Sequence, residues 1–428
     1  MKNRHFLINI SWPLAEKVIK LMASLISGVL VARHLGPVDY GVLSFSLGFV
    51  AIFSAISTMG INSILVKDIV EGEVDKNIIF GSAILIRLIG LIVAVCFTII
   101  LSTLFVSNAE QQTAIKLLSL TFLFQIFSFI ECYYQAKLRN KVVSVASIFI
   151  SIISVSAKLI ALYLGSNLEI FIILYIFDSL LQFIIYYFLL RKDIINVRLL
   201  KVSYKYTVMV ISRSWPLIFS GIVVVIYMKI DQLMIGEIIG VKEVGIYTAA
   251  VRMTEVFYFI PMVITNAVFP TLVSKRNDSE LKMEVFFKKL LLCMSLFSVF
   301  VALLLYSISD YLFWFLYGEE YIGSSKVFDV YIWSSLFVYI GVVSAKWFII
   351  EGLQKLTLYR TLFGCVINVC LNYYIIPIHG AYGAALTTVL SQFCANILFN
   401  LFDKRTRKLL RLQVCMFDIP GFIRLKNV

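Results

Sequence analysis

The feature that most constrains this chain is an internal repeat. Ser11-Trp12-Pro13-Leu14 recurs 203 residues later as Ser214-Trp215-Pro216-Leu217, and each copy opens a long apolar run. Gly36 and Gly41 precede Gly240 and Gly245 by 204 residues, and Lys67 precedes Lys275 by 208. Three landmarks in register predict two halves of similar length and similar build.

The composition places the repeat in a membrane. Hydrophobic residues make up 61% of the chain, charged residues only 15%, and the mean hydropathy is +0.93. A soluble fold cannot bury that much apolar surface. Apolar runs of about twenty residues, each long enough to cross roughly 30 Å of hydrocarbon, recur along the chain. The runs are continuous rather than alternating, which favours helices over a β-barrel.

We expect an all-α protein with twelve transmembrane helices. Their approximate ranges are 9–33, 38–66, 78–106, 112–136, 142–164, 168–190, 207–236, 243–273, 286–308, 326–350, 356–377 and 381–402. Lys and Arg gather at the N-terminus, in the connections after even-numbered spans and in the C-terminal tail. The opposite connections hold only Arg33, Lys116, Lys242 and Lys326. This bias predicts that both termini are cytoplasmic.

The predicted domains follow from the repeat. Two six-helix bundles, 1–195 and 207–403, are joined by a basic cytoplasmic linker, 196–206, and followed by a basic tail, 404–428. Because six is even, the bundles share one orientation, an arrangement typical of transporters that move one half against the other. The net charge of +13 lies mostly in cytoplasmic segments, which favours anionic lipid over nucleic acid as the partner. We expect residues 403–408 to lie on the membrane surface.

Several enzyme classes are disfavoured by what the sequence lacks. It has no phosphate-binding loop of the Gly-x4-Gly-Lys-Ser/Thr type, which disfavours ATP as the direct energy source. The longest outer connection, 309–325, is too short for the acceptor site of a membrane glycan polymerase or ligase. The seven cysteines form no CxxC or Cys/His cluster, so we expect no disulfide, metal site or cofactor.

Charged residues inside the spans are the candidate site. A charge at mid-membrane costs about 2.5–3.5 kcal/mol on insertion scales, so such charges usually face a cavity or each other. The cations are Lys17, Lys20, Arg87, Lys158, Arg213, Lys229, Arg252 and Lys346, and the anions include Glu16, Glu131, Asp178, Asp231 and Glu255. Glu16 shares a helix face with Lys20, and Arg252 with Glu255. These charges are either internal salt bridges or the lining of a polar lumen between the halves.

The surplus of cations bears on the substrate. A pump for cationic drugs would need the opposite sign, whereas Lys and Arg suit a diphosphate. We expect Lys20 and Arg252 to contact the diphosphate, helped by Lys17, Arg87 and Lys158. The candidates for ion coupling are Glu16, Glu255, Asp178 and Glu131. Pro13 and Pro216, at matching places in the two halves, are either hinges or plain helix starts.

At these residues the chain resembles the polysaccharide (O-antigen type, Wzx-like) flippases of the multidrug/oligosaccharidyl-lipid/polysaccharide (MOP) exporter superfamily. The resemblance spans the chain and rests on four segments: Asn9 to Lys17, Ala32 to Gly41, Asp231 to Tyr247, and Gly380 to Ala385.

The resemblance implies two bundles in a V around a lumen. It implies alternating-access transfer of undecaprenyl-diphosphate-linked oligosaccharide to the periplasmic face of the bacterial inner membrane, for O-antigen, capsule or exopolysaccharide synthesis. It also implies coupling to a proton or sodium ion, and a polysaccharide polymerase and chain-length regulator as partners. Drug exporters share the fold, so an ion-coupled exporter of drugs or cations remains an alternative.

Overall fold

The structure is a computed structural model that describes residues 2–193 and 200–417. Within these ranges the chain is helical and has no strand, as the all-α prediction requires. Contacts between helices divide it into two compact units, 1–233 and 234–428. The predicted linker residues 196–199 and tail residues 418–428 lie outside the described ranges. Helix α8 begins at Tyr204, inside the predicted linker, and the predicted bundle limits stay a prediction.

The described residues of the first unit form nine helical segments, the last of which continues past Leu233. They are α1 (Lys2–Thr58), α2 (Asn62–Glu71), α3 (Lys76–Phe105), α4 (Ala109–Ser119), η1 (Leu120–Phe129), α5 (Ile130–Ala136), α6 (Asn140–Tyr163), α7 (Leu168–Asp193) and α8 (Tyr204–Ile238).

The second unit contains the remaining segments. They are α9 (Val241–Glu255), η3 (Val256–Tyr258), α10 (Phe259–Asp278), α11 (Glu280–Tyr317), η4 (Glu319–Tyr321), α12 (Ile322–Tyr331), α13 (Ser334–Ile350), α14 (Gln354–Asn396), η5 (Leu398–Leu401), α15 (Arg407–Val414) and η6 (Cys415–Phe417).

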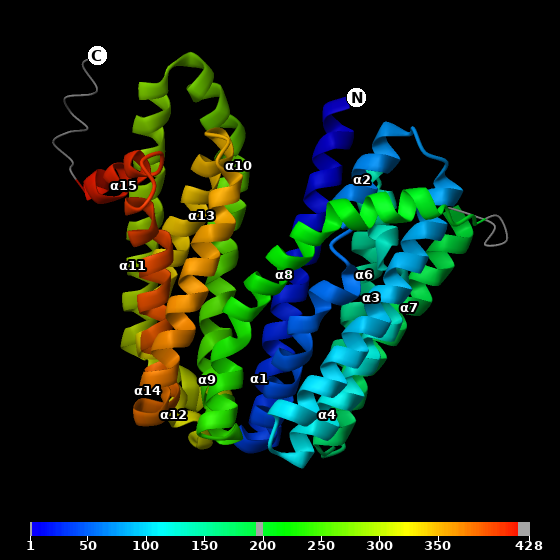
Figure 1. The fold of residues 1–428 in the computed structure, drawn as a ribbon. Coiled ribbons are helices and arrows are strands. Elements are labelled where there is room, and N and C mark those ends of the chain that lie inside the picture. Colours follow the sequence, from blue (N-terminus) through cyan, green and yellow to red (C-terminus); the bar gives the residue numbers. More distant parts are fainter. Residues whose placement is uncertain (1, 194–199, 418–428) are drawn as a thin grey trace. The chain divides into compact units, whose positions relative to one another are not determined.

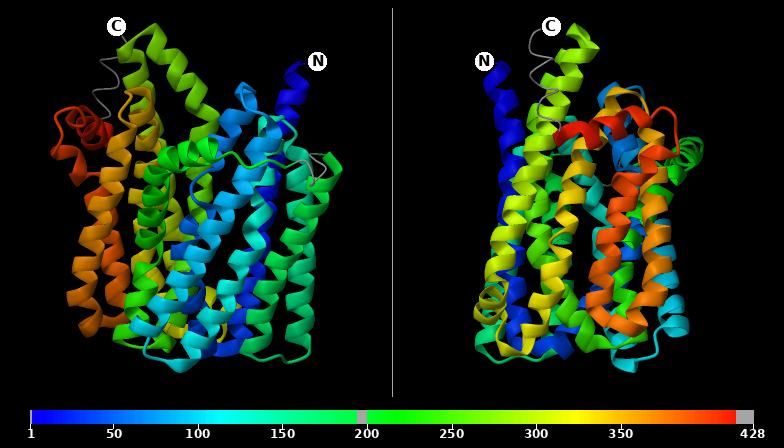
Figure 2. Two further views of the ribbon diagram at one scale, coloured as in Figure 1. Left: turned by 45° about the vertical axis from the view of Figure 1, so that its right-hand side comes forward. Right: turned by 90° about the vertical axis from the view of Figure 1, so that its left-hand side faces the viewer.

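The structure agrees with the prediction of twelve transmembrane helices when each helix that folds back on itself is counted as two crossings. Nine helices in the described ranges are long and apolar enough to span a membrane, and the bent pair α12 and α13 adds a tenth. Helix α1 contains a non-helical glycine at Gly36 and α14 contains one at Gly380, and each helix folds back there (Figures 1 and 2). Counting each of these two as two crossings brings the number to twelve.

The predicted repeat is visible in the backbone. Gly36 (φ 71°, ψ 173°) and Gly240 (φ 131°, ψ 170°) both have positive φ, which favours glycine, and each ends the first helix of its half. The fourth crossing of each half is also interrupted. In the first half η1 separates α4 from α5, and in the second half α12 and α13 meet at a 46° bend.

Pro13 and Pro216 also match in place. Both lie inside long helices, about three turns from the first residues, Lys2 and Tyr204. Of the two alternatives for these prolines, the plain helix start is therefore wrong. Since neither proline has a backbone N–H to donate, each removes one helical hydrogen bond and permits bending at the same level of its helix. A hinge role stays a prediction.

Each unit has its own apolar core. In the first unit, residues of α2, α3, α5, α7 and α8 pack together, with Phe80, Phe129 and Tyr186 fully buried. In the second unit, Phe287 and Trp347 pack with residues of α10 and with the C-terminal helix α15. Both cores are rich in aromatic rings, whose large apolar area accounts for much of the buried surface.

Candidate functional site: buried charges of the helical units

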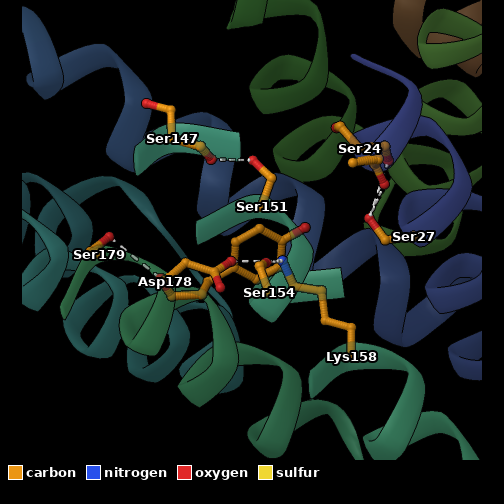
Figure 3. Close-up of polar contacts among 10 residues, drawn as sticks. Ser24, Ser27, Ser147, Ser151, Ser154, Lys158, Asp178 and Ser179 are labelled. Atoms are coloured by element: carbon orange, nitrogen blue, oxygen red, sulfur yellow. Dashed lines mark hydrogen bonds and ion pairs between the residues drawn. The ribbon is translucent and has the colours of Figure 1, made fainter. Parts of the chain in front are cut away.

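The structure brings Lys158 and Asp178 together. Lys158 Nζ of α6 lies 2.7 Å from Asp178 Oδ2 of α7, and the two side chains are 8% and 23% exposed (Figure 3). Lys158 Nζ also donates to Ser154 Oγ at 3.0 Å. It lies 4.3 Å from the centre of the Tyr175 ring, within cation–π distance. The ammonium is thus held on three sides by groups from two helices.

Helix α6 places this lysine at the end of a polar stripe. Ser147, Ser151, Ser154 and Lys158 follow at intervals of four, three and four residues, so they share one face of the helix. Ser24 and Ser27 of α1 lie near the same face in Figure 3, and α1 packs along α6. The spacing of these serines was the sequence signal that could have marked Lys158 as part of a polar face.

The Lys158–Asp178 pair is incompletely satisfied. Asp178 Oδ1 is buried and has no hydrogen-bond partner among the described residues. Two opposite charges in a low-dielectric setting attract strongly, but each has lost its hydration shell. An anionic group that competed for Lys158 would weaken the pair.

Arg87, predicted to help bind the diphosphate, is buried among neutral hydrogen-bond acceptors. It is only 1% exposed and its guanidinium donates to three neutral acceptors. Nη2 donates to Asn62 Oδ1 at 2.6 Å, while Nη1 donates to Ser128 Oγ and, at 3.5 Å, to the Gln125 carbonyl. Arg87 thus joins α2, α3 and η1 inside the first unit, and a contact with substrate would require this network to open.

Glu131 accepts a hydrogen bond from a buried tyrosine. The hydroxyl of Tyr186 on α7 donates to Glu131 Oε1 at 2.5 Å, and Tyr186 is 1% exposed whereas Glu131 is exposed. A similar contact joins α8 to α2, where the Tyr206 hydroxyl donates to Asp68 Oδ2 at 2.6 Å. Sequence reasoning did not pair these residues, because 55 and 138 positions separate them.

The predicted face shared by Glu16 and Lys20 is present on α1. Lys20 Nζ lies 2.7 Å from Glu16 Oε1, and the Lys20 side chain keeps 45% of its surface exposed. Lys17 is exposed as well. Because these cations lie within an apolar helix long enough to span the membrane, their open surface needs a polar environment.

Arg252 and Glu255 belong to the second unit. Both are half-buried on the last turns of α9, a helix that packs against α12 and α14. Lys20 and Arg252 lie in different units, so their joint contact with one ligand stays a prediction. The same holds for the coupling roles of Glu16, Glu255, Asp178 and Glu131.

The predicted site omitted Lys346, an intramembrane cation of the second unit. Lys346 of α13 is half-buried, and its Nζ donates to Asn266 Oδ1 of α10 at 2.7 Å. It lies 5.2 Å from the centre of the Phe269 ring. Unlike Lys158 and Lys20, this lysine is held by neutral groups.

Comparison with known proteins identifies the family. A model of the family described as polysaccharide biosynthesis protein matches residues 6–276. The chain belongs to this family. A second family model, MatE, matches residues 216–374. The membership and the long apolar helices indicate a multi-pass protein of the bacterial inner membrane.

Individual relatives agree with this membership. A putative O-antigen transporter of Shigella flexneri is 22% identical over 393 residues, which cover 89% of this chain and 93% of that one. The fold is similar to that of the lipid II flippase MurJ in an inward closed conformation, with a TM-score of 0.73, 15% identity, and coverage of 98% and 93%. It is also similar to an inward-facing MATE family transporter of the MOP superfamily, with a TM-score of 0.72, 15% identity, and coverage of 92% and 95%. The fold is therefore that of the MOP superfamily, as expected from sequence.

Proposed function

We propose that this protein is a flippase that transfers an undecaprenyl-diphosphate-linked oligosaccharide from the cytoplasmic to the periplasmic face of the bacterial inner membrane. The observation that carries the proposal is membership of the polysaccharide biosynthesis family over residues 6–276. The O-antigen relative supports the same substrate class. The fold is common to flippases and drug exporters, so it does not choose between them.

The intramembrane charges support an anionic substrate. Lys20 and Lys17 are exposed within an apolar helix, and Arg252 is half-buried on α9. In this proposal Lys20 and Arg252 contact the diphosphate, because Lys and Arg donors neutralise and hydrogen-bond phosphate oxygens. Lys17 assists them, and Arg87 and Lys158 contribute only after their present contacts open.

Coupling to a proton or sodium ion is part of the same proposal. Asp178 is the strongest candidate, because one of its oxygens contacts Lys158 and the other is buried with no hydrogen-bond partner among the residues that the structure describes. A proton or cation on Asp178 would weaken its hold on Lys158, and an anion near Lys158 would favour that uptake. Glu16, paired with Lys20, would act similarly on α1. Glu131 and Glu255 are further candidates for the uptake step.

A deletion in the organism that carries this gene tests the proposal. We expect loss of surface polysaccharide, with single lipid-linked repeat units accumulating on the cytoplasmic face and full recovery on re-expression. Normal polysaccharide combined with greater drug sensitivity would instead favour the ion-coupled exporter, the second candidate supported by the MatE match. Exported but short polymer would point to a polymerase.

A further inference from the structure

We propose that Lys346 is a diphosphate-binding residue of the second unit, where it receives the substrate headgroup on the cytoplasmic side. This inference rests on the proposed function, because it takes the anion to be the diphosphate of a lipid-linked substrate. It starts from a contrast between the intramembrane lysines.

The contrast lies in what holds each ammonium. Lys158 is paired with Asp178 and Lys20 with Glu16, both at 2.7 Å. Lys346 has the same 2.7 Å contact, but its acceptor is the neutral amide oxygen of Asn266. A carboxylate cancels the charge of a lysine, whereas an amide orients the ammonium and leaves its charge in place.

The hydrogen-bonding capacity of Lys346 is also partly unused. An ammonium has three N–H donors, and the recorded contacts of Lys346 with described residues are one amide oxygen and the face of Phe269. The side chain is half-buried, so part of it is open to a ligand. A phosphate group offers several anionic oxygens and would satisfy the remaining donors.

Among the described residues Lys346 forms no ion pair, and its hydrogen bond goes to a neutral amide. Glu351, five residues further along the chain, is ion-paired with Arg276 at 3.4 Å. Arg360 of α14 is 8% exposed and packs over the Phe348 ring. Lys346, which is half-buried, is therefore more open to a ligand than Arg360 is.

The depth of Lys346 suits a headgroup. It lies four residues before Ile350, the last residue of α13, which is about 6 Å at 1.5 Å per residue. The distribution of Lys and Arg predicts that the turn after α13 is cytoplasmic. A lipid-linked diphosphate sits at the level of the headgroups, so a cation one turn inside this end would meet it early.

Binding of farnesyl diphosphate to the purified full-length protein tests the inference. Farnesyl monophosphate and farnesol are the comparison ligands, and native mass spectrometry in detergent gives the affinities. We expect Lys346→Ala to weaken diphosphate binding at least tenfold, Lys346→Arg to retain most of it, and Lys355→Ala, at an exposed lysine near the start of α14, to leave it unchanged.

A second variant separates charge from folding. Asn266→Asp places a carboxylate where the amide now contacts Lys346, reproducing the pairing of Lys158 with Asp178. We expect this variant to fold and to lose diphosphate binding as Lys346→Ala does, whereas Asn266→Ala keeps binding.

The outcomes are distinguishable. If the wild type binds the diphosphate and Lys346→Ala binds it equally well, the inference is wrong and the proposed function stands. If the wild type does not prefer diphosphate to farnesol, the substrate class itself is wrong. If phosphatidylglycerol displaces the probe at equal concentration, the site takes general anionic lipid and the inference is overturned.

Discussion

Lys158 of α6 and Asp178 of α7 form an ion pair 2.7 Å long in which the lysine is buried and the aspartate is half-buried, and one oxygen of the carboxylate has no hydrogen-bond partner among the described residues. This contact joins two neighbouring helices. It also holds two opposite charges in a place that little water reaches. The loss of either residue therefore leaves the other charge without an opposite charge beside it.

The first prediction concerns the loss of one residue of the Lys158–Asp178 pair. Asp178→Ala and Lys158→Ala should each destabilise the protein by about 3–5 kcal/mol, because each leaves one buried charge unpaired. The double variant should be more stable than either single variant, since both charges are gone. The measurement is the temperature at which half of the detergent-purified protein loses its monodisperse elution. Ser151→Ala, on the same face of α6, is the control and should shift this temperature little. Equal losses in single and double variants would contradict the prediction.

The second prediction concerns the start of α8. The hydroxyl of Tyr206 donates to Asp68 at 2.6 Å, and the two residues are 5% and 6% exposed. Tyr206→Phe should cost about 1.5–3 kcal/mol, the usual range for a hydrogen bond to a charged group. Tyr204→Phe is a matched control two residues earlier, where the ring is 84% exposed. Thermal stability in detergent should fall for the first variant only, and an equal loss in both would argue against the contact.

The fold was largely predictable from the sequence, because the apolar runs and the glycines carry it. The predicted breaks between spans 9–33 and 38–66 and between spans 207–236 and 243–273 contain Gly36 and Gly240, and the structure gives both glycines a positive φ. The contact of Glu16 with Lys20 followed from helical periodicity alone. Such features depend only on residues close in sequence.

The partners of the buried charges were not predictable in this way. Lys158 meets Asp178, twenty positions away, because of how α6 and α7 are rotated, and periodicity does not fix the rotation of one helix against another. Arg87 was predicted to help bind the diphosphate, and the sequence did not indicate that neutral acceptors would surround it. Its neighbours Asn62 and Ser128 lie on other elements and carry no charge that would mark them as partners.

Helix α15 shows a third limit of prediction from the sequence. The cations of residues 403–408 predict a helix end on the membrane surface, which stays a prediction, and Arg407 and Arg411 of α15 are exposed. However, Leu409 and Leu412 are buried in the core of the second unit. The spacing of these leucines was visible in the sequence as the apolar side of an amphipathic helix. We propose that its exposed basic side binds anionic lipid.

The third prediction follows from the packing of α15 against the core of the second unit. Leu409 is fully buried and Lys408 forms ion pairs with Glu280 and Glu284 of α11. Leu409→Asp should release α15, because it buries a charge in an apolar core. Lys408→Ala should cost only about 0–1 kcal/mol, since exposed ion pairs are weak. Limited trypsin digestion should cut after Arg407 and Arg411 faster in the first variant.

Val414→Asp serves as the control for this digestion, because Val414 is 65% exposed on the same helix. Digestion of Leu409→Asp at the wild-type rate would mean that α15 does not depend on this contact.

The final prediction tests the proposed substrate contact on α9. Arg252→Ala should reduce surface polysaccharide at normal protein level, because a charged contact in a wet cavity contributes about 1–3 kcal/mol. That range corresponds to roughly a 5- to 150-fold loss of transport. Arg252→Lys should restore part of it, since a lysine keeps the charge but not the two-pronged geometry. Lys242→Ala, at an exposed lysine in the first turn of the same helix, is the control and should remain active. Lys20→Ala should behave like Arg252→Ala. If both variants are fully active, these residues are structural ion pairs, and the diphosphate must be bound by other cations of the chain.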